Sequence, residues 1–277
     1  MPEQSPTETG ERARVVALLR EEWGSLAELL AGLDDDAWSA PALPGWDVHD
    51  VVAHLVGTER MLAGVAVPTV PEAETSGPHV KNEIARSNEA WVVTLRARTH
   101  AELLDDFRSV TAERLAALEA LSDAEYDAPS WTPAGDATYG RFMEIRVFDS
   151  WMHEQDIRAA VGRPGHEAGP VAEQSVEEVV RALGYIVGKR AGVPAGSSVT
   201  LRLTGPVERT VHVAVDGRAT VVDALPEPAT AEVALSSSLF MRLAGGRVRA
   251  EDTLERIDLS GDVALARQVA SHLAFTI

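Results

Sequence analysis

The sequence predicts an α+β protein in which helices come first and a sheet follows. Apolar residues recur with a period of about 3.6 up to about Gly165, and from about Gly196 they alternate with polar residues. The chain has 277 residues, a length typical of two domains of about 100–200 residues each. We therefore expect a helical domain over residues 1–166 and a small α+β domain over residues 167–277.

Four segments of the first part have the apolar spacing of a helix. They are residues 9–32, 47–62, 81–121 and 138–160. Asp47 is a candidate N-cap for the second segment, and the third is expected to break near Thr99. The fourth ends before Gly162 with Pro164 beyond it, which is a helix-stop pattern. Pro- and Gly-marked loops are expected between the helices, at residues 40–45 and 68–78. Four helices joined by such loops predict an antiparallel four-helix bundle.

The second part has a strand pattern with turn signals between its runs. Apolar residues alternate over residues 199–203 and 211–215, with turns at Gly205-Pro206 and Asp216-Gly217, which predicts a meander. Further strands are expected at residues 231–235 and 257–259, and helices at residues 171–190, 236–244 and 263–273. The helix over residues 171–190 could pack on either domain, so the sequence does not fix the exact domain boundary.

Composition and charge exclude several classes of protein. The chain has 43 acidic residues against 25 Lys and Arg, a formal net charge of −18, and would repel the phosphates of nucleic acids. It has no apolar run near the ~20 residues of a membrane span. Its N-terminal segment is too acidic and too polar for a signal peptide. We therefore expect a soluble, cytoplasmic protein that binds neither nucleic acid nor membrane.

Several catalytic signatures are also missing. Cysteine is absent, which excludes disulfides, thiolate ligands and a cysteine nucleophile, so a metal site must use His and carboxylates. Ser150 has no G-x-S-x-G setting, and the chain contains neither a phosphate-binding loop nor a dinucleotide fingerprint.

His54, Asp149 and His153 are the candidate metal ligands. Asp149 lies four residues before His153, so both side chains leave the same face of one helix. His54 shares its helix face with apolar residues and is expected to point into the bundle, where an unpaired imidazole is costly. If the two helices pack together, these side chains can hold one divalent ion and leave a position open for water or substrate. Alternatively, Asp149 forms a hydrogen bond with one of the histidines and no metal binds.

The remaining candidates have weaker support. His49 lies five residues before His54 and is expected to cap a helix or face solvent. Asp156 follows His153 by three residues and is placed to accept a hydrogen bond that fixes the tautomer of that imidazole. The histidines at expected loops or helix ends are interpreted as ordinary residues without a ligand role: His79, His100, His166 and His272.

Two segments, LPGWDVHDVVAHL and RVFDSWMHEQDIRAAVGRP, resemble the mycothiol-dependent maleylpyruvate isomerase family. The segments TGPVERTVHVAVDG and FMRLAGGR resemble the small, sterol-carrier-protein-like α+β domain of that family, so the likeness covers most of the chain. The resemblance implies a DinB-like four-helix bundle that holds a divalent metal, usually zinc, at positions matching His54, Asp149 and His153. The characterised isomerase pattern has Glu where this chain has Asp149, whose side chain is shorter.

The resemblance also implies a reaction. Mycothiol, a thiol cofactor, would enter the open metal position, lose its proton and attack an electrophilic small molecule. Such an enzyme is an isomerase if the thiol adds and leaves again, and an S-transferase if the adduct is kept. Arg242 and Arg247 are the candidate catalytic residues, as cations for a substrate carboxylate. Two alternatives stay open: a binding or regulatory module, and a thiol-independent hydrolase or isomerase that uses metal-bound hydroxide.

Overall fold

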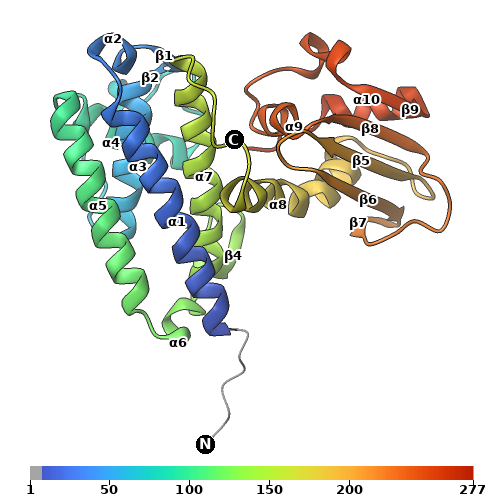
Figure 1. The fold of residues 1–277 in the computed structure, drawn as a ribbon, viewed down its shortest axis with the longest axis horizontal. Coiled ribbons are helices and arrows are strands. Elements are labelled where there is room, and N and C mark those ends of the chain that lie inside the picture. The colour runs from blue at the N-terminus through green and yellow to red at the C-terminus, as the bar shows by residue number, and fades with distance from the viewer. Residues whose placement is uncertain (1–7, 277) are drawn as a thin grey trace, which may run out of the picture. The chain divides into compact units, whose positions relative to one another are not determined.

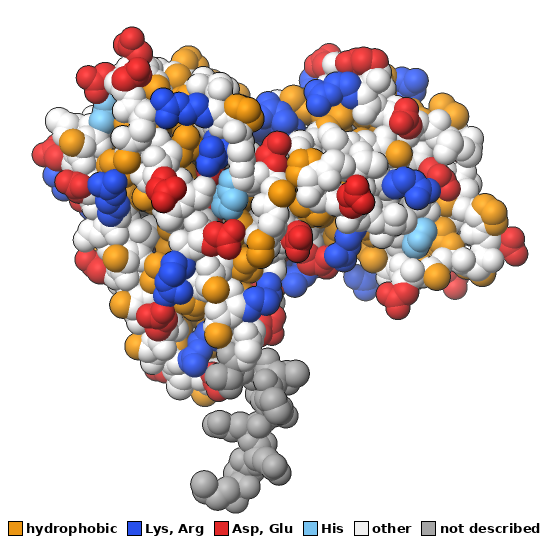
Figure 2. Space-filling model, in the orientation of Figure 1, with side chains coloured by type: hydrophobic (Ala, Val, Ile, Leu, Met, Phe, Trp, Pro, Cys, Tyr) orange, Lys and Arg blue, Asp and Glu red, His pale blue; other side chains and the backbone are white. Residues whose placement is uncertain are grey.

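The computed structural model describes residues 8–276 and divides the chain after His166 into two compact units (Figure 1). The first unit is mostly helical, and the second contains a five-stranded sheet. This order of helices and sheet confirms the predicted fold class. No helix within residues 8–276 is long and apolar enough to span a membrane. Acidic and basic side chains are mixed over the visible face of each unit (Figure 2).

Four long helices form the body of the first unit. They are α1 (Glu8–Ala31), α3 (Val48–Leu62), α5 (His100–Ala120) and α7 (Tyr139–Ala160). Both α1 and α3 pack against α5 and α7, so the four helices close around one core. Shorter helices complete the unit: α2 (Asp35–Trp38), η1 (Glu72–Glu74), α4 (Glu83–Leu95), which packs on α3, and α6 (Asp123–Tyr126).

The helices that carry the candidate ligands begin where the sequence predicts. Asp47 caps α3 by accepting a hydrogen bond from the backbone N–H of Asp50, and Thr138 caps α7 through the N–H of Arg141. Such a cap stabilises a helix by about 1 kcal/mol. The predicted break near Thr99 is confirmed, because Thr99 starts α5 with a capping box.

Two short β-hairpins precede α3 and α7. Their strands are β1 (Pro41–Leu43), β2 (Trp46–Asp47), β3 (Pro129–Thr132) and β4 (Gly135–Thr138). The expectation of a plain loop over residues 40–45 is therefore wrong. Gly45, at a φ of 87°, reverses the chain between β1 and β2. Each hairpin ends at the capping residue of the next helix and so fixes where that helix starts.

The second unit is a mixed sheet with helices packed on it. The strands lie in the order β7-β6-β5-β8-β9. They are β5 (Ser198–Thr204), β6 (Arg209–Asp216), β7 (Arg218–Val222), β8 (Ala231–Ser236) and β9 (Asp258–Gly261). The helices are α8 (Pro170–Tyr185), its π-helical continuation η2 (Ile186–Arg190), α9 (Ser237–Ala244), η3 (Ala250–Asp252), η4 (Leu254–Arg256) and α10 (Val263–Ser271).

The predicted meander is formed by β5, β6 and β7, which are antiparallel neighbours. β8 then returns beside β5 in parallel, with Val199 opposite Ala231. Alternation of apolar residues decides which face of the sheet a side chain joins, but not which strand lies next to it. The helix expected over residues 171–190 belongs to the second unit, where α8 packs on β7 and α9.

Candidate metal centre

Three side chains from α3 and α7 converge where these helices pack together. His54 lies on α3, and Asp149 and His153 lie one turn apart on α7. His54 Nε2 is 3.5 Å from one carboxylate oxygen of Asp149, and His153 Nε2 is 3.9 Å from the other. With one donor atom taken from each residue, all three atoms lie within 4.8 Å of one another. The structure thus brings together the residues that the sequence predicts as a set.

The two histidines of this set are buried and the carboxylate is partly open to solvent. His54 is 4% exposed and His153 8%, whereas the Asp149 side chain is 31% exposed. Two imidazole nitrogens and one carboxylate oxygen are typical ligands of zinc and of other divalent transition metals. The chemistry and the spacing of these donors fit a divalent metal ion.

Arg146 is the main residue of the site that the sequence analysis missed. It is buried one turn before Asp149 on α7 and forms an ion pair with that carboxylate. Its Nε also donates to Glu59 of α3 at 2.8 Å, and Glu59 accepts a second bond, of 3.1 Å, from Nε of Arg114 on α5. Charged residues are mostly exposed, and Glu59 lies far from Arg146 in the sequence. No local pattern therefore marked this buried network.

Burial and neighbouring charges together shift the pKa values of His54 and Asp149. Burial lowers the pKa of His54, and the carboxylate of Asp149 offsets only part of that effect. Burial would raise the pKa of Asp149, but the Arg146 guanidinium and the hydrogen bond from His54 outweigh it and hold that pKa well below its usual range. Near pH 7, His54 is therefore neutral and Asp149 ionised, as metal ligation requires.

Polar partners orient both imidazole rings. His153 Nδ1 lies 3.2 Å from an oxygen of Asp156, the partner that the sequence analysis named. His54 Nδ1 lies 3.5 Å from Oγ1 of Thr58, whose hydroxyl donates to the backbone carbonyl of His54 at 3.0 Å. Because the Nδ1 atoms face these partners, the Nε2 atoms are the ones that face Asp149.

The β1–β2 hairpin places an aromatic wall beside the site. The ring of Trp46 has its centroid 5.4 Å from that of His54 and 6.5 Å from that of His153. Its indole Nε1 donates to a carboxylate oxygen of Glu89 at 2.8 Å, and His79 Nε2 is 3.0 Å from the same oxygen. Glu89 and His79 thus hold Trp46 in place, a structural function that the position of His79 in a loop did not reveal.

His49 is buried, so the expectation that it caps a helix or faces solvent is wrong. Its Nε2 lies 3.0 Å from the carbonyl oxygen of Arg98, and its ring packs edge-on against Trp38. The connection between α4 and α5 passes over the start of α3 and supplies this acceptor. A sequence pattern within α3 alone carries no information about that connection.

A second group of titratable residues, the Glu22 cluster, joins α1, α7 and the segment after α7. It consists of Glu21, Glu22, Glu154, Arg158 and His166. Glu154 accepts hydrogen bonds from Arg158 at 2.7 Å and from His166 Nδ1 at 2.6 Å. Both oxygens of Glu22 are buried, and one of them lies 3.5 Å from His166 Nδ1. Burial and the charge of Glu154 raise the pKa of Glu22 well above its usual value.

Arg242 and Arg247 lie in the second unit at the C-terminal end of α9. Arg242 belongs to the last turn of that helix, and its carbonyl oxygen accepts a hydrogen bond from the backbone N–H of Arg247 at 2.8 Å. The Arg247 guanidinium donates to the carbonyl oxygen of Gly245 at 2.5 Å. Contact of these two residues with a substrate stays a prediction.

Two family models match the chain. The mycothiol maleylpyruvate isomerase N-terminal domain matches residues 19–158, and the MDMPI C-terminal domain matches residues 173–268. No curated protein matches the sequence.

Three solved structures are similar to the chain to different degrees. A mycothiol-dependent maleylpyruvate isomerase and a histidine-to-alanine mutant of it each have 17% identity and a TM-score of 0.57, over 91% of this chain and 94% of that chain. Sterol carrier protein 2 from Yarrowia lipolytica, in its apo form, has 13% identity over 36% of this chain and 92% of that chain. Its TM-score of 0.27 is too low to indicate a shared fold.

Proposed function

Because the chain belongs to the mycothiol maleylpyruvate isomerase family, we propose that it is a mycothiol-dependent enzyme with a divalent metal held by His54, Asp149 and His153. Its substrate is an electrophilic small molecule, and its reaction is an isomerisation or an S-transfer. The observation that carries the proposal is the meeting of three donor atoms within 4.8 Å on α3 and α7. We take the four long helices as a DinB-like bundle and keep the cytoplasmic location as a prediction from the sequence.

Zinc is the proposed ion, since imidazole and carboxylate ligands with one open position are typical of catalytic zinc sites. A bound divalent ion supplies positive charge that lowers the pKa of a coordinating thiol or water. The protein prepares its ligands for that ion: Arg146 keeps Asp149 ionised, and Asp156 orients the ring of His153. Trp46 covers one side of the two imidazoles and keeps water from that side.

The nucleophile is proposed to come from mycothiol, because the chain has no cysteine of its own. Reversible addition of a thiol to a conjugated cis double bond converts the substrate to its trans isomer without gain or loss of atoms. Arg242 and Arg247 are proposed to bind a carboxylate of the substrate, since guanidinium groups stay charged and match carboxylate geometry.

A metal-free binding module is the second candidate, and the ion pair between Arg146 and Asp149 favours it. Asp149 already has a cationic partner in Arg146, and His54 lies 3.5 Å from the same carboxylate. The charge of Asp149 is thus compensated by protein groups alone. In this case, treatment with a chelator would change neither ligand binding nor stability.

Thiol dependence tests the proposed reaction. We expect turnover of maleylpyruvate, followed by ultraviolet absorbance, with mycothiol present, and loss of turnover without it or in His54→Ala. The matched control is His272→Ala, which removes a histidine of the second unit bonded to a backbone carbonyl. Turnover by the metal-loaded protein without thiol would favour a metal-hydroxide enzyme instead. Equal turnover in His54→Ala and the wild type would exclude the proposed centre.

A further inference from the structure

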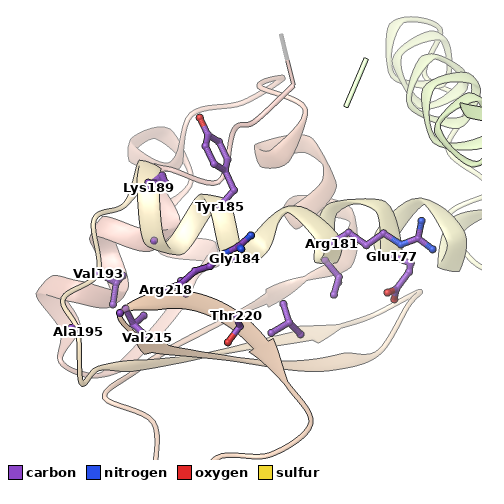
Figure 3. Close-up of a pocket in the computed structure, with 15 residues that line it drawn as sticks. Glu177, Arg181, Gly184, Tyr185, Lys189, Val193, Ala195, Val215, Arg218 and Thr220 are labelled. Carbon is purple, nitrogen blue, oxygen red and sulfur yellow. The ribbon is translucent and has the colours of Figure 1, made fainter. Parts of the chain in front are cut away.

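A cleft in the second unit opens between the helix formed by α8 and η2 and the β6–β7 hairpin (Figure 3). Its volume is about 910 Å³, which is within the range of small-molecule sites. Two glycines let the helix approach β7 closely beside the cleft. A Cβ atom on Gly184 would lie 2.8 Å from the carbonyl oxygen of Ala219, and one on Gly188 would lie 2.8 Å from its Cβ. The helix wall of the cleft is therefore anchored to the strand wall.

Basic side chains line this cleft although the chain as a whole has a net charge of −18. The cations are Arg181, Lys189 and Arg218, and Arg218 extends from β7 toward α8 (Figure 3). Within residues 8–276, no carboxylate forms a salt bridge with Lys189 or Arg218. Glu177, which also lines the cleft, is paired with Arg209 at 2.7 Å. Arg181 lies 4.0 Å from a carboxylate oxygen of Glu178, so the positive charge without a paired carboxylate is that of Lys189 and Arg218.

Apolar surface lies next to these cations. Val221 is 43% exposed and lines the cleft together with Val193 and Val215. Tyr185, which is 59% exposed, also borders the cleft, but its ring points away from the β6–β7 hairpin (Figure 3). Val221 is two residues after Ala219 on β7, so both side chains point to the face on which the helix packs. Val221 is exposed on that face because the helix does not cover it. An apolar ligand group would remove this surface from water.

The helix wall of the cleft is itself irregular. Residues Ile186–Arg190 form the π-helical turn η2, in which Ile186 and Val187 are buried and Lys189 is exposed. π-Helical turns are rare and occur frequently at functional sites. Within four residues, this turn thus has two buried apolar side chains and one exposed cation that lines the cleft.

From these features we propose that the cleft binds an organic anion with an apolar body and one carboxylate or phosphate group. The acidic group contacts Lys189 and Arg218, and the apolar body lies against Val221 beside Val193 and Val215. The cleft shares no residue with the proposed metal centre, so a test of ligand binding in the cleft is independent of the proposed reaction.

NMR titration of the valine methyl groups in the full chain tests this proposal. The probes are octanoate and octyl phosphate, with 1-octanol as the uncharged probe of the same length. The test variant is the double substitution Lys189→Gln and Arg218→Gln, both at exposed positions. The matched control is Arg256→Gln, an exposed cation of the same unit that does not line the cleft.

We expect octanoate or octyl phosphate to shift the methyl signals of Val193 and Val221 and to bind more tightly than octanol. The acid that binds more tightly identifies the preferred head group. The double variant should bind the acids about tenfold more weakly, since charge-assisted hydrogen bonds are lost, and Arg256→Gln should bind as the wild type does. Absence of shifts with every probe would overturn the proposal, and so would equal affinity for octanol or an unchanged affinity in the double variant.

Discussion

Replacement of Arg146 by Met should destabilise the first unit far more than the loss of an exposed ion pair. Arg146 is buried and donates to Glu59, which is also buried, and to Asp149. Loss of one partner from a buried pair costs about 3–5 kcal/mol, because the other charge stays buried. Here Arg114 still compensates Glu59, and Asp149 is 31% exposed to water. We therefore expect a loss near the lower end, about 3 kcal/mol.

Urea denaturation followed by tryptophan fluorescence measures this loss in the first unit, because all six Trp residues lie between positions 23 and 151. A chelator in the buffer removes any contribution from bound metal. The control is Arg20→Met, which breaks a pair with Glu119 whose side chains are 51% and 56% exposed. Such a pair contributes less than about 1 kcal/mol. Equal losses of unfolding free energy in the two variants would refute the argument from burial.

Three other substitutions test separate parts of the structure. Gly57→Ala should lower the free energy of unfolding in urea by about 1–3 kcal/mol, because its Cβ would lie 2.4 Å from Trp91. Gly24→Ala, whose Cβ would have nothing within 4 Å, should raise that free energy by about 0.5–1 kcal/mol. A more stable Gly57→Ala than Gly24→Ala would contradict the packing of α3 on α4. Glu22 has a raised pKa, so its contribution to stability is complete below its ordinary pKa and is lost as the pH rises through the raised value. As the pH rises, the free energy of unfolding of Glu22→Gln should therefore increase relative to that of the wild type, by at most about 1.4 kcal/mol per pH unit. If the free energies of the two proteins change with pH in parallel, Glu22 does not carry a buried proton. Asp156→Asn should weaken zinc binding about 10–100-fold in calorimetry, and unchanged affinity would show that Asp156 does not position its histidine.

The sequence predicts helices better than it predicts the short strands of the first unit. The starts of α3 and α7 follow from Asp47 and Thr138, because a cap is a local signal that one or two residues carry. The strands of the two hairpins have two to four residues, which is too short to show a period of two. The parallel pairing of β8 with β5 depends on contacts remote in sequence, and no alternation pattern records them.

The candidate metal ligands were predictable because spacing along one helix relates Asp149 to His153. The residues that surround these ligands could not be predicted from the sequence. Arg146 lies on the same helix, but its buried partner Glu59 is on α3, and the wall residue Trp46 comes from a hairpin that the sequence did not indicate. Residues that touch the site from other elements leave no periodic signal. Only the packing of α3, α5 and α7 shows that these charged and aromatic side chains lie around the candidate metal centre.

The zinc content of the purified chain shows whether His54, Asp149 and His153 form a metal centre. The wild-type chain, stripped with a chelator and then dialysed against zinc, should retain about one zinc per chain in elemental analysis. His54→Ala should retain less than about one-tenth of that amount, because an ion held by only two donors binds far more weakly, and His272→Ala should match the wild type. Circular dichroism on each variant shows whether the helices are kept. Less than about one-tenth of a zinc ion on the wild type, or full occupancy in a folded His54→Ala variant, would show that these three residues do not form the metal centre.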